Sequence, residues 1–128
     1  MSKAELDANK QLIRDFYKAM NSRDLEATFA FYASHARLDV VVEGPFGGKQ
    51  PVSRAALEAF YAAFPEIEFR VEAMTAEKDR VAVEISSRGI DSAGQPYGNR
   101  YHNLFIVKHS KIELFCEYPT GVSPSEPA

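Results

Sequence analysis

Glu117, near the end of the chain, is the residue whose type and position best fit a catalytic role. It lies in the segment GNRYHNLFIVKHSKIELFCEYPT, where apolar and polar side chains alternate. This period of two predicts β-strands over about residues 98–108 and 111–118, joined by a tight turn at residues 109–110. Glu117 shares its parity with Phe115, so the pattern places a carboxylate on a partly apolar face. A carboxylate there is either ion-paired or available for chemistry.

The chemistry open to Glu117 depends on its surroundings. In an apolar pocket, desolvation raises the pKa of a carboxyl toward neutrality, as proton exchange with a weakly acidic carbon or a carbonyl requires. Tyr101 and Asn103 share one face of the preceding strand and could orient a substrate oxygen, which makes these three the candidate catalytic residues. The alternative is that Glu117 pairs with a basic residue such as Arg100 or accepts hydrogen bonds from backbone amides. The candidate ligand-binding residues are Phe16, Tyr17, Phe60, Asn99 and Phe105.

Length and composition predict one domain. A chain of 128 residues with 45% hydrophobic and 26% charged residues can bury a core of its own and does not resemble a disordered chain. We expect this domain to span residues 1–118. Residues 119–128 contain three prolines and few apolar side chains, so we expect a flexible C-terminal tail.

Charge and cysteine content argue against several kinds of partner. The net charge is -3 and no basic stripe occurs, so nucleic acid is not expected to bind. No apolar run is long enough to cross a bilayer and no signal-peptide core is present, so we expect a cytoplasmic protein without membrane contact. Cys116 is the only cysteine, and the histidines lack ligand spacing, so neither a disulfide nor a metal nor another cofactor is expected.

Three amphipathic helices are predicted in the first half of the chain. Ser2 and Glu5 have the spacing of a capping box, which predicts a helix that ends near residue 21. Asp24 and Ser53 are plausible N-caps of two further helices, expected over about residues 24–34 and 53–64. The apolar residues of each helix recur at helical spacing, so each helix has one face that must be covered.

The second half of the chain predicts a sheet. Further strands are expected at residues 38–43, 69–77 and 80–89, with a loop at residues 44–51. Helices followed by consecutive antiparallel strands indicate an α+β domain with helices on one face of a curved sheet. Leu104 and Ile106 lie on the other parity of their strand, which the helices cannot cover. A second copy of the sheet is the simplest cover, so we predict a homodimer.

Three segments carry a resemblance to a known family: DFYKAMNSRDLEATFAFYA, LEAFYAAFPEIEF and PYGNRYHNLFIVKHSKIELFCEY. They resemble the SnoaL-like and ketosteroid-isomerase-like proteins of the nuclear transport factor 2 superfamily, and the resemblance covers about residues 9–119. It implies a cone-shaped α+β barrel with a pocket between the sheet and the helices, and dimers formed through the sheet. This superfamily includes isomerases, cyclases, dehydratases and non-catalytic binding proteins.

The ketosteroid isomerases imply positions for three groups. Their first-helix tyrosine falls at Phe16, next to Tyr17, and their protonated aspartic acid falls at Asn103. An asparagine there could still donate a hydrogen bond to a carbonyl. Their general base falls near Val40, beside Asp39, which is either a second acid or a solvated carboxylate at the sheet edge.

Two other groups of relatives imply different residues. SnoaL-type cyclases have an aspartate on the long strand that acts as the base, where this chain has Asn99 and Asn103. The last strands are most similar to the small phenazine-biosynthesis A/B-type proteins, in which a glutamate matching Glu117 acts as an acid near a ketone. The helix-3 histidine of that family falls at Ala56. The resemblance therefore implies a cofactor-independent isomerase, cyclase or dehydratase acting on a small apolar carbonyl compound, or a non-catalytic binding module of the same fold.

Overall fold

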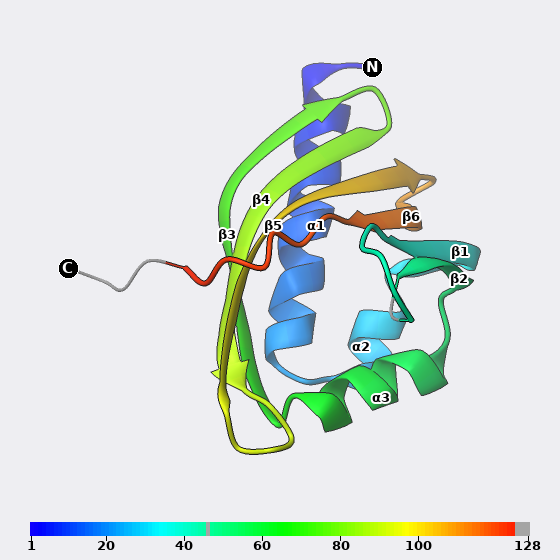
Figure 1. Ribbon diagram of the computed structural model, residues 1–128. Coiled ribbons are helices and arrows are strands. Elements are labelled where there is room, and N and C mark those ends of the chain that lie inside the picture. The colour runs from blue at the N-terminus through cyan, green and yellow to red at the C-terminus, as the bar shows by residue number, and fades with distance from the viewer. Residues whose placement is uncertain (46, 125–128) are drawn as a thin grey trace.

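The computed structural model describes residues 1–45 and 47–124 (Figure 1). Its helices are α1 (Lys3–Asn21), α2 (Leu25–Phe29) and α3 (Arg54–Ala63). Its strands are β1 (Tyr32–Val40), β2 (Gly48–Pro51), β3 (Glu66–Glu77), β4 (Arg80–Ile90), β5 (Pro96–Lys108) and β6 (Lys111–Glu117). Within these described ranges, no helix is both long and apolar enough to span a membrane.

The helices begin where the capping residues predict. The Ser2 hydroxyl accepts from the backbone N–H of Glu5 at 3.1 Å, and the Glu5 carboxylate accepts from the backbone N–H of Ser2 at 3.3 Å. Asp24 and Ser53 cap α2 and α3 by accepting from the N–H three residues later. These bonds satisfy amides that have no partner inside the helix.

The prediction for the segment after Asp24 was wrong in its boundaries. The helix expected to continue to Ser34 is little more than one turn long, and β1 starts at Tyr32 rather than at residue 38. Pairing with β6 overrides the local helical spacing: the carbonyl of Phe31 accepts from the N–H of Ile112 at 2.8 Å, and β1 continues parallel to β6.

The six strands form one sheet in the order β2-β1-β6-β5-β4-β3. All neighbours are antiparallel except β1 and β6. The expected loop at residues 44–51 contains the edge strand β2, which the sequence analysis missed. Figure 1 shows the long strands curving around α1, with α2 and α3 at one end. The predicted fold class, α+β with a curved sheet wrapped on three helices, is confirmed, with one parallel pair in an otherwise antiparallel sheet.

The β5–β6 turn is formed by His109 and Ser110, as predicted. Their φ angles are 52° and 60°, as in the two-residue turns whose twist matches a hairpin. A register shift follows, because Val107 pairs with Ile112 and Ile106 pairs with Leu114. The shift turns Ile112 into the core, where it is fully buried, although strict alternation would place it on the face of Leu114.

Phe16 lies at the centre of the core and is fully buried. Five aromatic rings have centroids within 5.2–6.0 Å of its ring: Tyr17, Phe31, Tyr32, Phe105 and Phe115. Two of these rings come from β5 and β6, far along the chain, and two from residues 31–32 at the start of β1. The apolar face of α1 therefore joins the sheet to the segment between α2 and β1.

Residues 118–121, which we call the C-terminal strap, continue from β6 alongside β5. The N–H of His102 donates to the carbonyl of Tyr118 at 3.2 Å, and the N–H of Thr120 donates to the carbonyl of Arg100 at 2.9 Å. A flexible tail was expected from residue 119 onward. In the structure, however, the first residues of this segment are hydrogen-bonded to the sheet. Residues 125–128 lie outside the described part of the chain.

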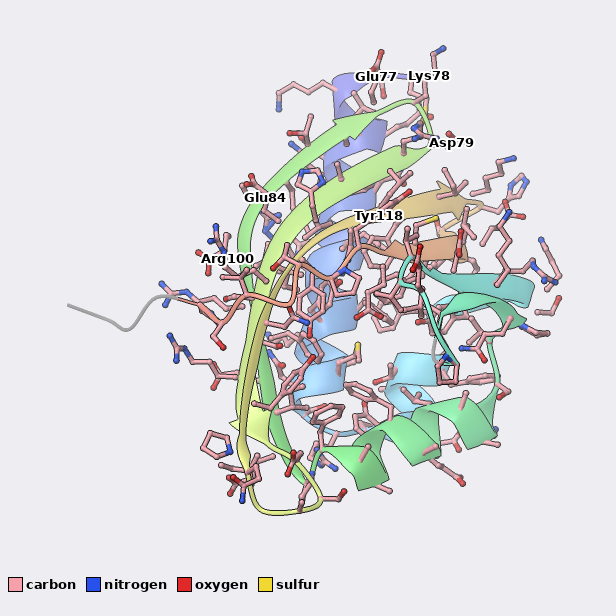
Figure 2. All side chains as sticks on the ribbon, viewed as in Figure 1. Glu77, Lys78, Asp79, Glu84, Arg100 and Tyr118 are labelled. Atoms are coloured by element: carbon pink, nitrogen blue, oxygen red, sulfur yellow. The ribbon has the colours of Figure 1, made fainter. Side chains whose placement is uncertain are left out.

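The face of the sheet away from α1 is mixed in character. Figure 2 shows Glu84 and Arg100 directed away from the helices. Leu104 and Ile106 lie on the same face and are half-buried, and Tyr118 is 43% exposed. The homodimer predicted from this face stays a prediction.

Candidate functional site

A cavity of about 110 Å³ lies between α1, the start of α3 and the inner face of the sheet. Most of its wall is apolar, with Met20, Leu38, Leu57, Phe60, Phe69 and Phe115 as the larger side chains. Its main polar groups come from Tyr17, Tyr32, Asn103 and Glu117. The cavity therefore combines an apolar wall with a few groups able to exchange hydrogen bonds or protons, as ligand sites commonly do.

Glu117 is positioned by the pairing of β6 with β1. Its backbone is opposite Val40 of β1, and its carbonyl accepts from the N–H of Val41 at 2.8 Å. Phe115, two residues earlier, faces the same cavity. The alternation of β6 thus directs the Glu117 side chain to the face of Phe115, the parity that the sequence predicted, and this face borders the cavity.

The carboxyl of Glu117 has an unusual electrostatic environment. Burial raises its pKa from 4.5 to about 7. Among the described residues, no cation forms an ion pair with it and no N–H donates to it. Arg100, the partner considered from sequence, is exposed and belongs to the outer face. Near neutral pH this carboxyl can therefore both give and take a proton.

Tyr17 and Asn103 form a hydrogen-bonded pair in the cavity wall. The side-chain N–H of Asn103 donates to the Tyr17 hydroxyl at 3.0 Å, and the Asn103 carbonyl oxygen accepts from the backbone N–H of Tyr118 at 3.1 Å. Asn103 is only 2% exposed, so both bonds are shielded from water. The amide thereby satisfies its oxygen and one of its two N–H groups within the protein.

The Tyr17 hydroxyl remains a neutral donor. Burial raises its pKa well above the usual range; the hydrogen bond from Asn103 opposes this shift, and the negative charge of Glu117 adds to it. Its oxygen already accepts from Asn103, and within the described ranges its own proton has no acceptor. A ligand oxygen in the cavity could accept that proton.

Tyr32 is a cavity residue that the sequence analysis missed. Burial, and then the charge of Glu117, raise the pKa of its hydroxyl. No described residue forms a hydrogen bond with that hydroxyl. Tyr32 fits the helical spacing of the preceding residues, so no local pattern indicates that it begins a strand and faces the cavity.

The structure brings together only some of the residues selected from the sequence. Glu117, Asn103, Tyr17 and Phe60 all line the cavity. Phe16 and Phe105 do not; both are fully buried in the core and support the wall from behind.

Tyr101 and Asn99 lie farther along β5, outside the cavity lining. The Tyr101 hydroxyl bonds to the Ser87 hydroxyl at 2.8 Å. The Asn99 oxygen accepts from the N–H of Gly121 in the strap at 2.9 Å, and its amide nitrogen donates to the Tyr97 hydroxyl at 3.2 Å. The polar groups of both residues therefore have partners inside the protein.

Asp39 and Ala56, which the resemblance placed beside or at catalytic positions of relatives, lie in different parts of the fold. Asp39 pairs in register with Cys116, so both lie on the face of the sheet opposite to Glu117. Ala56 lines the cavity at the start of α3, where its short side chain leaves room. The described residues contain no cluster of three or more His, Cys, Asp or Glu side chains suited to a metal.

Comparison with solved structures shows the fold. TerC, co-crystallised with polyporic acid, matches with a TM-score of 0.75 and 16% identity, over 88% of this chain and 92% of that chain. AusH from Aspergillus nidulans matches with a TM-score of 0.77 and 15% identity, over 93% and 88%. An NTF2-like protein of unknown function from Burkholderia pseudomallei matches with a TM-score of 0.74 and 18% identity, over 94% and 93%.

No curated protein matches the chain. The family comparison is specific, however, because the SnoaL-like domain matches residues 13–115, which include most of the cavity wall. At the identities above, the solved structures establish the NTF2-like fold and nothing about activity. By this family match, the chain belongs to the SnoaL-like domain family.

Proposed function

We propose that this protein binds a small, uncharged, carbonyl-bearing molecule in the cavity and that Glu117 moves a proton on it. The observation that carries the proposal is a carboxyl with a pKa raised to about 7 in an apolar cavity, with no ion-pair partner among the described residues. Catalytic bases and acids are efficient when their pKa lies near the working pH.

The cavity groups suit proton transfer next to a carbonyl. The Tyr17 hydroxyl donates a hydrogen bond to the carbonyl oxygen, while the Glu117 carboxylate takes a proton from the adjacent carbon. The C–H bond breaks, its electron pair moves toward the carbonyl oxygen, and Tyr17 stabilises the resulting enolate. Glu117 then returns the proton to the same or another atom. Isomerisation, cyclisation and dehydration all begin with such a step.

The wall favours an uncharged ligand of limited size. The described lining contains no lysine, arginine or histidine, so an anionic ligand would have no cation to pair with. A cavity of about 110 Å³ suits a single ring or a short branched chain. We therefore choose 2-cyclohexen-1-one, a neutral ring ketone, as the probe.

The alternative is a binding module without catalysis. It is favoured because the described cavity lining holds no carboxyl besides Glu117 and no histidine: Asp39 faces the other side of the sheet and position 56 is an alanine. In that case Tyr17 and Glu117 would hold a ligand that leaves unchanged.

One experiment separates the two functions. We expect wild-type protein in deuterated water to exchange the α-hydrogens of 2-cyclohexen-1-one faster as the pH rises through about 7, measured by proton NMR. Glu117→Gln should slow this exchange about a hundredfold or more, because a general base contributes at least that factor, whereas Glu113→Gln should not. Binding without exchange would select the binding module. Absence of binding would refute both functions for this ligand class.

The outer face of the sheet supports a second proposal, a homodimer. Leu104 and Ile106 are half-buried and Tyr118 is exposed, and a twofold-related sheet would cover all three. Light scattering should give twice the chain mass of 14.3 kDa. A monomer at micromolar concentration would exclude the dimer without affecting the cavity.

A further inference from the structure

The C-terminal strap lies along β5 and begins directly after the residue that carries the cavity carboxyl. The strap runs along β5, with an isolated bridge between Tyr101 and Pro119, and Figure 2 shows Tyr118 beside the curved sheet. Glu117 is the last residue of β6 and directly precedes the strap. Contacts that fix the strap therefore also fix the backbone that carries the cavity carboxyl.

Two asparagines on β5 accept backbone N–H groups of the strap. Asn103 accepts from Tyr118 at 3.1 Å, and Asn99 accepts from Gly121 at 2.9 Å. Each amide nitrogen then donates to a tyrosine hydroxyl, with Asn103 bonded to Tyr17 and Asn99 bonded to Tyr97. The two sites are built alike, but only the first tyrosine lines the cavity.

The strap settles the direction of the hydrogen bond between Asn103 and Tyr17. A backbone N–H can only donate, so the Asn103 atom that faces Tyr118 must be the oxygen. The NH₂ group then faces Tyr17 and the Tyr17 oxygen must accept. The hydroxyl proton of Tyr17 is consequently available only on its other side.

We propose that Asn103 is a positioning residue: held by the strap, it fixes Tyr17 as a hydrogen-bond donor toward the cavity beside Glu117. The use of that donor by a ligand rests on the proposed function, whereas the direction of the hydrogen bond does not. A carboxylate at position 103 would reverse the direction, because an ionised carboxylate only accepts. A protonated carboxylic acid could still donate, as the amide does.

The first test needs no ligand. In ¹⁵N–¹H NMR spectra we expect Tyr17→Phe to shift the side-chain amide resonance of Asn103, because the acceptor of its N–H is lost, while the Asn99 amide stays in place. Tyr97→Phe should produce the reverse pattern. An Asn103 amide that is unmoved in Tyr17→Phe would overturn the proposed direction, whatever the cavity binds.

The second test uses the variant Asn103→Asp with 2-cyclohexen-1-one as probe. Below the pKa of the new carboxyl, the acid donates to Tyr17 and the probe should bind as in wild type. Above that pKa, Tyr17 donates to the carboxylate, and probe affinity should fall up to about tenfold, the worth of one hydrogen bond. Wild type should lack this additional pH dependence. Isotope-edited NMR locates the pKa of the new carboxyl.

Asn99→Asp is the matched control, since it places the same charge on the same strand next to the same strap. It should leave probe binding and its pH profile unchanged. An Asn103→Asp profile that does not follow the new carboxyl, or the same profile in both variants, would overturn the positioning role. If wild type does not bind the probe, the proposed ligand class fails, and the amide shifts alone decide the role of Asn103.

Discussion

The space between α1 and the sheet has a filled half and a hollow half. In the filled half, Phe16 is fully buried among five aromatic rings. In the hollow half, Tyr17 and Phe60 line a cavity that also receives Glu117. The two halves share α1 and meet at Tyr17, Tyr32 and Phe115, which pack on Phe16 and also line the cavity. The filled half stabilises the fold by close packing, whereas the hollow half is less closely packed and leaves space in which a ligand can bind.

The filled half stabilises the fold enough to tolerate the unpaired carboxyl of Glu117 in the hollow half. A carboxyl without a partner in an apolar cavity destabilises the folded state whenever it is ionised. The close packing around Phe16 offsets such a cost, because a filled aromatic core contributes several kcal/mol. Truncating Phe16 should therefore destabilise the protein, whereas neutralising Glu117 should stabilise it.

The largest expected effect is in the filled half. Phe16→Ala should lower the free energy of unfolding by about 3–5 kcal/mol, because it leaves a cavity among rings that cannot collapse into it. Phe60→Ala should cost less, since Phe60 is half-buried and already borders empty space. Urea unfolding followed by circular dichroism measures both. Equal losses would remove the distinction between the two halves.

The next effect is in the hollow half and depends on pH. The pKa of Glu117 is about 7 in the folded state, whereas the ordinary value of a glutamate carboxyl is 4.5, so the folded state retains a proton that the unfolded state releases. The free energy of unfolding should therefore fall as pH rises from about 4.5 to about 7. Glu117→Gln should lack this pH dependence. Its free energy of unfolding should exceed that of wild type by about 3 kcal/mol at pH 8 and by little at pH 4.

Glu113→Gln is the control for that measurement. Glu113 lies on the same strand, but its carboxylate contacts His35 Nε2 at 2.6 Å and Lys108 Nζ at 4.0 Å, near the surface. Its replacement should cost up to about 1 kcal/mol instead of stabilising the protein. A gain at pH 8 in Glu113→Gln, or none in Glu117→Gln, would contradict the assignment of the unpaired carboxyl to the cavity.

Local signals in the sequence predicted much of the fold. Ser2, Asp24 and Ser53 start helices because their side chains cap nearby amides, and the turn at residues 109–110 closes a hairpin between neighbouring strands. The pairing of β1 with β6 was not predictable in this way, since these strands lie at opposite ends of the chain. The edge strand β2 was hidden by the glycines and prolines around it.

The site was predictable where alternation decides and not elsewhere. Period two placed Glu117 and Asn103 on the inner face correctly. Periodicity could not tell whether Phe16 or Tyr17 borders the cavity, because the rotation of α1 is set by packing against the sheet. Tyr32 was missed for a related reason: only its long-range pairing with Ile112 makes it part of a strand.

The smallest expected effect concerns α3, which forms part of the cavity wall without a single fully buried side chain. The Arg54 guanidinium bonds to both oxygens of Glu26 on α2, with Nη2 at 2.7 Å from Oε2. Both side chains are exposed, so Glu26→Gln should lower the free energy of unfolding by less than about 1 kcal/mol, and by less at high salt. The amides of α3 should nevertheless exchange faster with deuterium while those of β5 do not, because the bond ties the wall to the rest of the fold.

Asp7→Asn, which breaks an exposed ion pair with Lys3 on α1, is the matched control and should leave α3 unchanged. Unchanged exchange in Glu26→Gln would mean that the wall is held by other contacts, such as those from Arg23 to the carbonyls of Tyr61 and Phe64, and the hollow half would then be as rigid as the filled one.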